Sequence, residues 1–214
     1  QQATYDPLEF YRSMLELCPP GATGYSWGEM VTSFVSGATA TGLYAGRVLA
    51  NVAAQNPQIA DSITCALYPR MSRDIPAWTY NDFPCVCIPS AASNKAEAKL
   101  FAASLFDPAG YIPQLHAAPG HVLPVLETVA ENPAYRDNEI IDRYPQEIDL
   151  MASAAAQGYN LGFETTAHQP NTKAGEIIAS NAIAEMVQRV VLNDEDPQVA
   201  VGNTVTRLEE IMRS

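Results

Sequence analysis

The residues best suited to bind a small molecule lie in one stretch, VSGATATGLYAGR at 35–47. Tyr44 carries an aromatic ring that can stack on an apolar surface, and Arg47 carries a planar fork of N–H donors. Gly46 stands between them, and a glycine lets the backbone approach a ligand closely. This combination is typical of recognition rather than of bond breaking, so the stretch predicts a binding site.

Motifs for metal and nucleotide chemistry are absent from the sequence. No H-E-x-x-H, G-x-x-x-x-G-K or G-x-G-x-x-G pattern occurs. The histidines, at 116, 121 and 168, are too scattered to indicate a metal site. We therefore expect no catalytic residue, no metal and no cofactor.

The charge balance excludes one class of partner. The 214 residues contain 24 Asp and Glu against 12 Lys and Arg, a net charge of −12. Phosphate backbones repel such a surface, so we expect no nucleic-acid binding. The 47% of hydrophobic residues is ample for a core.

Helical spacing of apolar residues predicts most of the secondary structure. Phe10, Met14 and Leu17 share one face of a helix that begins near residue 7. Trp27 begins a second short helix, and we expect its ring to lie in the core. Further helices are expected at about 47–55, at 94–107, from either 139 or 145 to 158, at 173–192 and at 196–212.

Short apolar segments between these helices predict β-strands at 38–44, at SITCALYP (62–69) and at FPCVCIP (83–89). In SITCALYP, Ile63, Cys65 and Leu67 alternate with other residues, so one side of the predicted strand is more apolar than the other. Apolar strands separated by helices are typical of α/β proteins, so we predict an α/β fold.

The cysteines leave two alternatives open. Cys18, Cys65, Cys85 and Cys87 have no zinc or redox spacing, and the last two point to the same side of a strand. Either all are buried thiols, or Cys65 forms a disulfide with Cys85 or Cys87.

Several segments, in order along the chain, resemble the extracellular solute-binding proteins of carbohydrate-type ABC importers. FVSGATATGLYAGR (34–47) is similar to a helix that ends in an aromatic-x-x-Gly pattern and leads to a ligand-side aromatic. ITCALYPR (63–70) is similar to the strand before a proline loop. CVCIPSAASNKAEAKLFAASLFDP (85–108) is very similar to the I-x-x-x-S-x-N-K-x-x-A-x-x-F helix, and APGHVLPV (118–125) to the G-x-x-P turn that follows it.

The resemblance implies a helix-rich, periplasmic-binding-protein-like (type II) α/β fold of two lobes, of which this chain is the C-terminal portion. It implies that about 1–80 and 145–214 form most of one lobe, that about 81–144 contribute to the other, and that a missing N-terminal lobe completes the cleft. The implied protein is not an enzyme but the substrate-binding component of an ABC transporter. It captures a carbohydrate or polyol-like solute by hinge closure, hands it to a membrane ABC permease, and is periplasmic or extracellular and cell-surface associated.

The resemblance also implies the ligand-binding residues, which are Tyr44, Gly46, Arg47, Trp78, His116, Gly162 and Phe163. The segment at 44–47 follows a predicted strand end, where clefts of open α/β sheets lie. Sugars present apolar faces and a rim of hydroxyls, which aromatic rings and polar groups match. Arg47 stands where several family members carry a tryptophan, and its donors suit a polyol, a glycoside or an acidic group.

Two other functions remain open from the sequence. A carbohydrate hydrolase or lyase needs two carboxylates that face one cleft, and such a pair can come from residues far apart in the chain. A protein-interaction module would instead present flat surfaces at Tyr44, Arg47 and Trp78.

Overall fold

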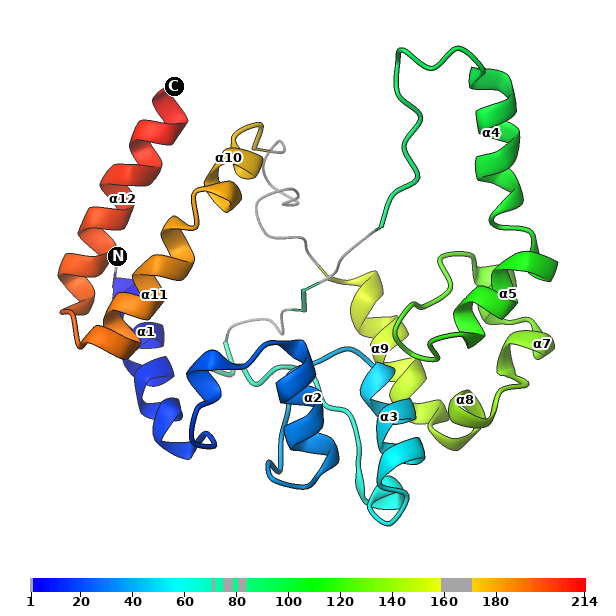
Figure 1. Cartoon of the computed structure of the whole chain (residues 1–214), viewed down its shortest axis with the longest axis horizontal. Coiled ribbons are helices and arrows are strands. Elements are labelled where there is room, and N and C mark those ends of the chain that lie inside the picture. Colours follow the sequence, from blue (N-terminus) through cyan, green and yellow to red (C-terminus); the bar gives the residue numbers. More distant parts are fainter. Residues whose placement is uncertain (1, 71, 75–78, 81–83, 159–170) are drawn as a thin grey trace. The chain divides into compact units, whose positions relative to one another are not determined.

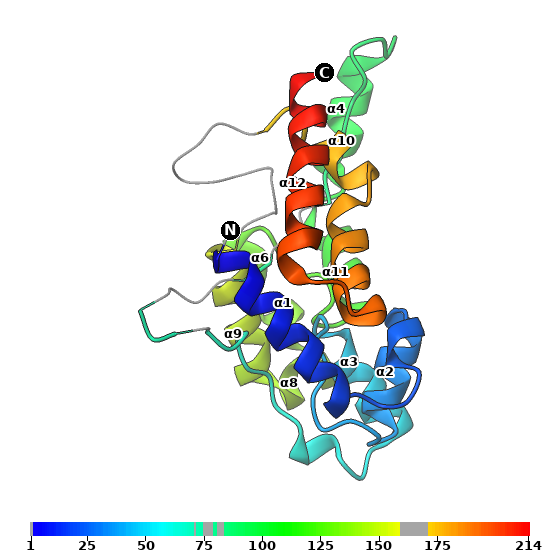
Figure 2. The same ribbon diagram turned by 90° about the vertical axis from the view of Figure 1, so that its left-hand side faces the viewer.

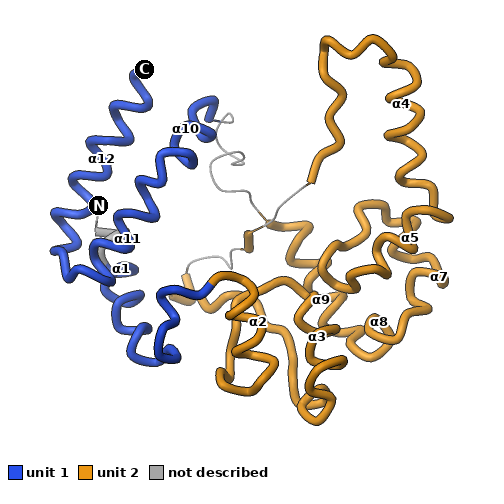
Figure 3. The backbone as a smooth tube through the Cα atoms, in the orientation of Figure 1, with its two compact units in different colours: residues 1–25, 160–214 blue, residues 26–159 orange. Residues whose placement is uncertain are grey.

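A computed structural model describes residues 2–70, 72–74, 79–80, 84–158 and 171–214 (Figure 1). The chain divides into two compact units, one formed by 1–25 with 160–214 and the other by 26–159 (Figure 3). Each unit has its own buried apolar residues. The lobe boundaries expected from the resemblance stay a prediction.

The predicted α/β fold is wrong. The structure is 61% helical, and its described residues form almost no strand and no sheet. Residues 41–45, 63–70 and 84–89, where strands were expected, have no regular secondary structure. A strand is stable only beside another strand that accepts and donates its backbone hydrogen bonds, and within the described residues these segments have no such neighbour. A periplasmic-binding-protein-like α/β architecture is therefore not the fold of this chain.

The unit formed by both chain ends is built from helices. They are α1 (Gln2–Met14), α10 (Ala174–Ala179), α11 (Ala182–Asn193) and α12 (Pro197–Arg213), with the 3₁₀ turns η1 (Leu15–Leu17) and η2 (Ala22–Gly24). Helices α11 and α12 lie side by side, and α1 packs against both (Figure 2). Their shared core consists of Leu8, Met186, Val190, Ala200 and Val201.

Helix α1 turns a different face inward from the one predicted. Leu8 is buried, whereas Phe10 is 54% exposed and Leu17 is 79% exposed. The guanidinium of Arg12 donates from Nε to the Val190 carbonyl (3.1 Å) and from Nη2 to the Glu195 carbonyl (3.0 Å). These bonds attach α1 to the end of α11. The spacing of apolar residues cannot predict a polar contact of this kind.

The long helix predicted at 173–192 is interrupted. Asn181 has a left-handed backbone (φ 54°) and separates α10 from α11. Arg207 on α12 donates to the Ser180 carbonyl (2.7 Å), which satisfies one acceptor at the break. The start of α12 is as predicted, because the Asp196 carboxylate accepts from the backbone N–H groups of Gln198 and Val199 and Pro197 opens the helix.

The second unit carries shorter helices. They are α2 (Trp27–Val35), α3 (Arg47–Gln55), α4 (Lys95–Ser104), α5 (Pro108–His116), α6 (Glu127–Ala130), α7 (Pro133–Arg136), α8 (Glu139–Arg143) and α9 (Pro145–Ala156), with the 3₁₀ turn η3 (Ala60–Ser62). No helix in the described part of the chain is long and apolar enough to span a bilayer.

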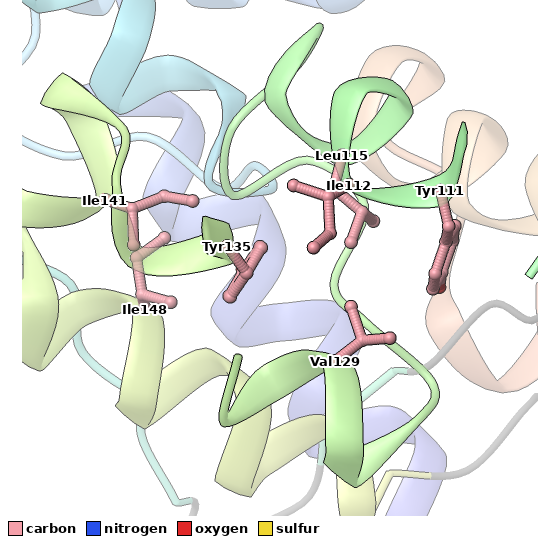
Figure 4. Packing of buried hydrophobic residues seen from close by; sticks show 7 residues of the cluster. All are labelled: Tyr111, Ile112, Leu115, Val129, Tyr135, Ile141 and Ile148. Atoms are coloured by element: carbon pink, nitrogen blue, oxygen red, sulfur yellow. The ribbon is translucent and has the colours of Figure 1, made fainter. Parts of the chain in front are cut away.

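Two apolar clusters hold this unit together. The larger joins α5, α6, α7, α8 and α9, and Tyr135 lies in its middle between the isoleucines of α8 and α9 and the side chains of α5 (Figure 4). The smaller joins α2, α3 and η3 through Val35, Val52 and Ala60. The hydroxyl of buried Tyr144 donates to the Ala60 carbonyl (2.8 Å) and so links the two clusters.

Candidate functional site

Two loops that are far apart in sequence meet at one corner of the second unit. The Tyr44 ring stacks on the His121 ring, with ring centroids 6.4 Å apart and planes inclined by 13°. Beside this pair, the backbones of Gly46 and Gly120 come into contact. A Cβ built on Gly46 would lie 2.5 Å from the Gly120 carbonyl oxygen and 2.5 Å from Met151 Cε, so only glycine fits there. Gly120 has a left-handed backbone (φ 73°), which turns its loop toward Gly46.

Arg47 stands at the outer edge of the corner. It is the first residue of α3, directly after the buried Gly46, and its own side chain is exposed. It forms no ion pair or hydrogen bond with the described residues, and the first turn of α3 contains no carboxylate. Tyr44 is half-buried, so part of its ring remains accessible. The corner thus offers stacking rings and free N–H donors.

His116 has a partner within the protein. Its Nε2 donates to the Tyr135 carbonyl (2.8 Å), and its ring stacks on the Tyr135 ring at a centroid distance of 6.1 Å. These contacts fix the orientation of the imidazole. The other histidine of the same segment, His121, stacks on Tyr44, although no signal in the sequence singled it out. The remaining candidates, Trp78, Gly162 and Phe163, lie outside the described residues.

An open depression of about 410 Å³ lies where η3 meets the α8–α9 junction. Its lining includes the carboxylates of Asp61, Asp142 and Glu147. Asp61 accepts from Arg143 (2.8 Å), and Glu147 accepts from the Thr64 hydroxyl (2.9 Å). The depression therefore brings together three carboxylates from two parts of the chain, Asp61 from η3 and Asp142 and Glu147 from the α8–α9 junction.

A smaller depression, of about 260 Å³, lies between α11 and α12 and includes two arginines. Arg207 is paired with Glu185 and bonded to the Ser180 carbonyl. Arg189 donates to the Thr204 hydroxyl and the Ala200 carbonyl. Both guanidiniums join helices to one another, which indicates a structural role.

Residues 24–28, GYSWG, match the G-x-S-x-G pattern of serine hydrolases. The expectation of no catalytic residue did not consider this match. Ser26 is the N-cap of α2, and its backbone N–H and hydroxyl both contact the Glu29 carboxylate in a capping box. These bonds lower the pKa of Glu29, with the Ser26 hydroxyl as the largest cause. A nucleophile of this pattern sits at a strand-to-helix turn beside a histidine. Within the described residues Ser26 has neither, and it is the N-cap of α2.

The predicted core position of Trp27 is wrong, because its side chain is 75% exposed. It follows Ser26 and is the first residue of α2. An exposed tryptophan is a stacking surface, and its place at a helix start was the signal available in the sequence.

No disulfide joins the four cysteines, and Cys18, Cys85 and Cys87 are exposed. The prediction that all four are buried is therefore wrong, and so is the prediction of a disulfide between Cys65 and Cys85 or Cys87. Burial raises the pKa of the half-buried Cys65 thiol, and the nearby Glu147 carboxylate raises it further. Among the described residues, no group of His, Cys, Asp and Glu could hold a metal ion.

No protein-family model matches the chain, and a search of curated proteins finds no similar sequence. The resemblance to solute-binding proteins thus stays a prediction that depends on the quoted segments.

Proposed function

We propose that the chain is the solute-binding component of an importer, and that it binds a carbohydrate or polyol-like solute at the corner of Tyr44, Arg47 and His121. One observation carries the proposal. Tyr44 and Gly46 were expected to contact the ligand, and the structure brings them against the turn at 118–121, which follows another expected contact, His116, in the chain. Because about seventy residues separate the two segments in the chain, local sequence does not account for this meeting.

The chemistry of the corner suits a sugar. The half-buried Tyr44 ring and the exposed His121 ring present flat surfaces to the C–H face of a pyranose. The Arg47 guanidinium supplies donors for ring-edge oxygens. The close packing of Gly46 on Gly120 holds both loops in place, so little conformational entropy is lost on binding.

Transfer to a membrane ABC permease, hinge closure against another lobe and a periplasmic or extracellular location stay predictions from the resemblance. The helical fold adds no support to them. The proposed binding chemistry does not require a sheet, since function depends on the site rather than on the scaffold.

The test is a ¹H–¹⁵N NMR titration of the chain with glucose, galactose, maltose and glucitol, up to tens of millimolar. We expect saturable shifts at residues 44–49 and 118–123, and a Tyr44→Ala variant that weakens binding about tenfold, or about 1.4 kcal/mol. Tyr11→Ala is the control, because Tyr11 is an exposed tyrosine that lies in the other unit. No shift with any of these ligands, or equal affinity of Tyr44→Ala and the parent, would refute the proposal.

A carbohydrate hydrolase is the second candidate, and the depression lined by Asp61, Asp142 and Glu147 is the observation in its favour. Hydrolysis of chromogenic glycosides that is lost in both Asp142→Asn and Glu147→Gln would support it. Activity absent from the parent, or retained in both variants, would leave the binding function as the better account.

A further inference from the structure

We infer that the proposed site prefers an acidic carbohydrate, such as a hexuronate, to the matched neutral sugar, with Arg47 as the residue that determines this preference. The inference rests on the proposed function of the same corner. It starts from the charge pairing of the whole chain. Of the 12 Lys and Arg side chains, 7 form ion pairs within the described residues, and Arg47 is among those that do not.

The surroundings of Arg47 leave its charge available. Helix α3 packs against α2, α8 and η3, and each of these carries acidic residues. Glu29 on α2 is bonded to Ser26, and Asp61 on η3 is bonded to Arg143. Glu139 and Asp142 on α8 form no ion pair with Arg47. No carboxylate of the described residues therefore pairs with Arg47, and a bound anion would fill that place.

The hydrogen-bonding capacity of the corner also favours an acid. A guanidinium only donates, whereas a sugar hydroxyl both donates and accepts and is best matched by a site that offers both. Of the corner residues, the Tyr44 hydroxyl can both donate and accept, whereas Arg47 can only donate, so the preference for an acid comes from Arg47. A carboxylate only accepts, and it can take two parallel N–H bonds from one arginine.

The net charge of the chain makes the predicted preference informative. At a net charge of −12 the protein as a whole favours cationic ligands. Salt weakens this effect, because at 0.1 M it screens charges that are more than about 10 Å apart. Nonspecific attraction would thus rank glucosamine above glucose and glucose above glucuronate. The opposite order requires a local positive group at the place of binding.

The experiment titrates the chain with glucuronate, glucose and glucosamine, monitored by NMR at residues 44–49 and 118–123. We expect glucuronate to bind about three- to tenfold more tightly than glucose, and glucosamine to bind most weakly. Arg47→Gln should remove the difference, because it should weaken glucuronate binding more than it weakens glucose binding. Lys99→Gln is the control, because Lys99 is an exposed cation on α4 that has no ion pair with the described residues.

Each outcome separates this inference from the proposed function. Equal affinities for glucuronate and glucose, or a preference that survives Arg47→Gln, would overturn the inference and leave carbohydrate binding in place. Saturable binding of glucuronate that Arg47→Gln weakens and Lys99→Gln does not would support it. No binding of any of the three sugars would overturn both.

Discussion

Gly46 and Gly120 touch backbone to backbone, and a Cβ at Gly46 would come within 2.5 Å of the Gly120 carbonyl oxygen. The first glycine precedes α3 and the second follows α5, so the contact joins the α2–α3 part of the unit to the larger apolar cluster. Met151 on α9 closes the same space from the other side, and its Sδ would lie 2.8 Å from a Cβ at Gly46. The stacked rings of Tyr44 and His121 belong to the same two segments.

The Gly46→Ala substitution should destabilise the chain by about 1–3 kcal/mol, because backbone atoms cannot move aside as a flexible side chain can. Gly110→Ala is the control, since a Cβ at Gly110 would meet nothing within 4 Å and alanine favours the helix there. Urea unfolding monitored by circular dichroism gives both values. Equal stability of the two variants would contradict the close packing at Gly46.

Two buried tyrosines should respond in opposite ways to loss of the hydroxyl. Tyr144→Phe removes the donor to the buried Ala60 carbonyl and should cost about 1–2 kcal/mol. The Tyr135 hydroxyl is buried with no hydrogen-bond partner among the described residues, so Tyr135→Phe should be neutral or stabilising by up to about 1 kcal/mol. The two unfolding free energies are measured under one set of conditions, and a larger loss for Tyr135→Phe would contradict the structure.

Stability should fall at alkaline pH. Burial is the largest cause of the raised pKa values of Tyr135 and Tyr144, and a tyrosine ordinarily titrates near about 10. The folded state holds these protons more tightly than the unfolded state, so their contribution is complete below about pH 10 and is lost as pH rises through the raised values. Urea unfolding from pH 8 to 11 should show this decline, with a shallower slope in the Tyr135→Phe, Tyr144→Phe double variant. A slope that is the same in both proteins would assign the decline to other groups.

Arg12 should hold α1 in place. Replacement by methionine removes two charge-assisted hydrogen bonds to the Val190 and Glu195 carbonyls and should cost about 1–3 kcal/mol. Arg213→Met is the control, because Arg213 is 74% exposed and makes an i,i+4 pair that is worth at most about 0.5 kcal/mol. Hydrogen exchange of the α1 amides should accelerate in the first variant alone. Unchanged exchange there would show that Leu8 and its apolar neighbours suffice.

Local signals in the sequence predicted some helix boundaries correctly. The start of α12 at Asp196–Pro197 follows from a carboxylate that can accept from free N–H groups and from a proline that already has helical φ. The end of α3 at Gln55 follows from Asn56–Pro57, because a proline disfavours the helical backbone of the residue before it. In both cases the groups that decide the boundary lie within a few residues of it.

Prediction failed where the deciding contact was distant. Apolar spacing offered Phe10, Met14 and Leu17 as the inner face of the first helix, but Arg12 and Leu8 contact the α11–α12 pair instead. The alternation at 63–69 indicated which side chains share a side of an extended segment, yet it contained no information about a partner strand. For the candidate site, the segment at 44–47 could be recognised from its residue types, whereas His121 could not.

The sequence by itself determined the acidic character of the chain, some helix ends such as the start of α12 and the end of α3, and the presence of an aromatic ring and a guanidinium beside a glycine, because composition, capping and residue type are local properties. Tertiary structure alone decided that no sheet forms among the described residues, and that Gly46 meets Gly120 so that Tyr44 reaches His121. These outcomes depend on contacts between residues far apart in the chain, and such contacts form only when the apolar clusters of the whole unit pack together.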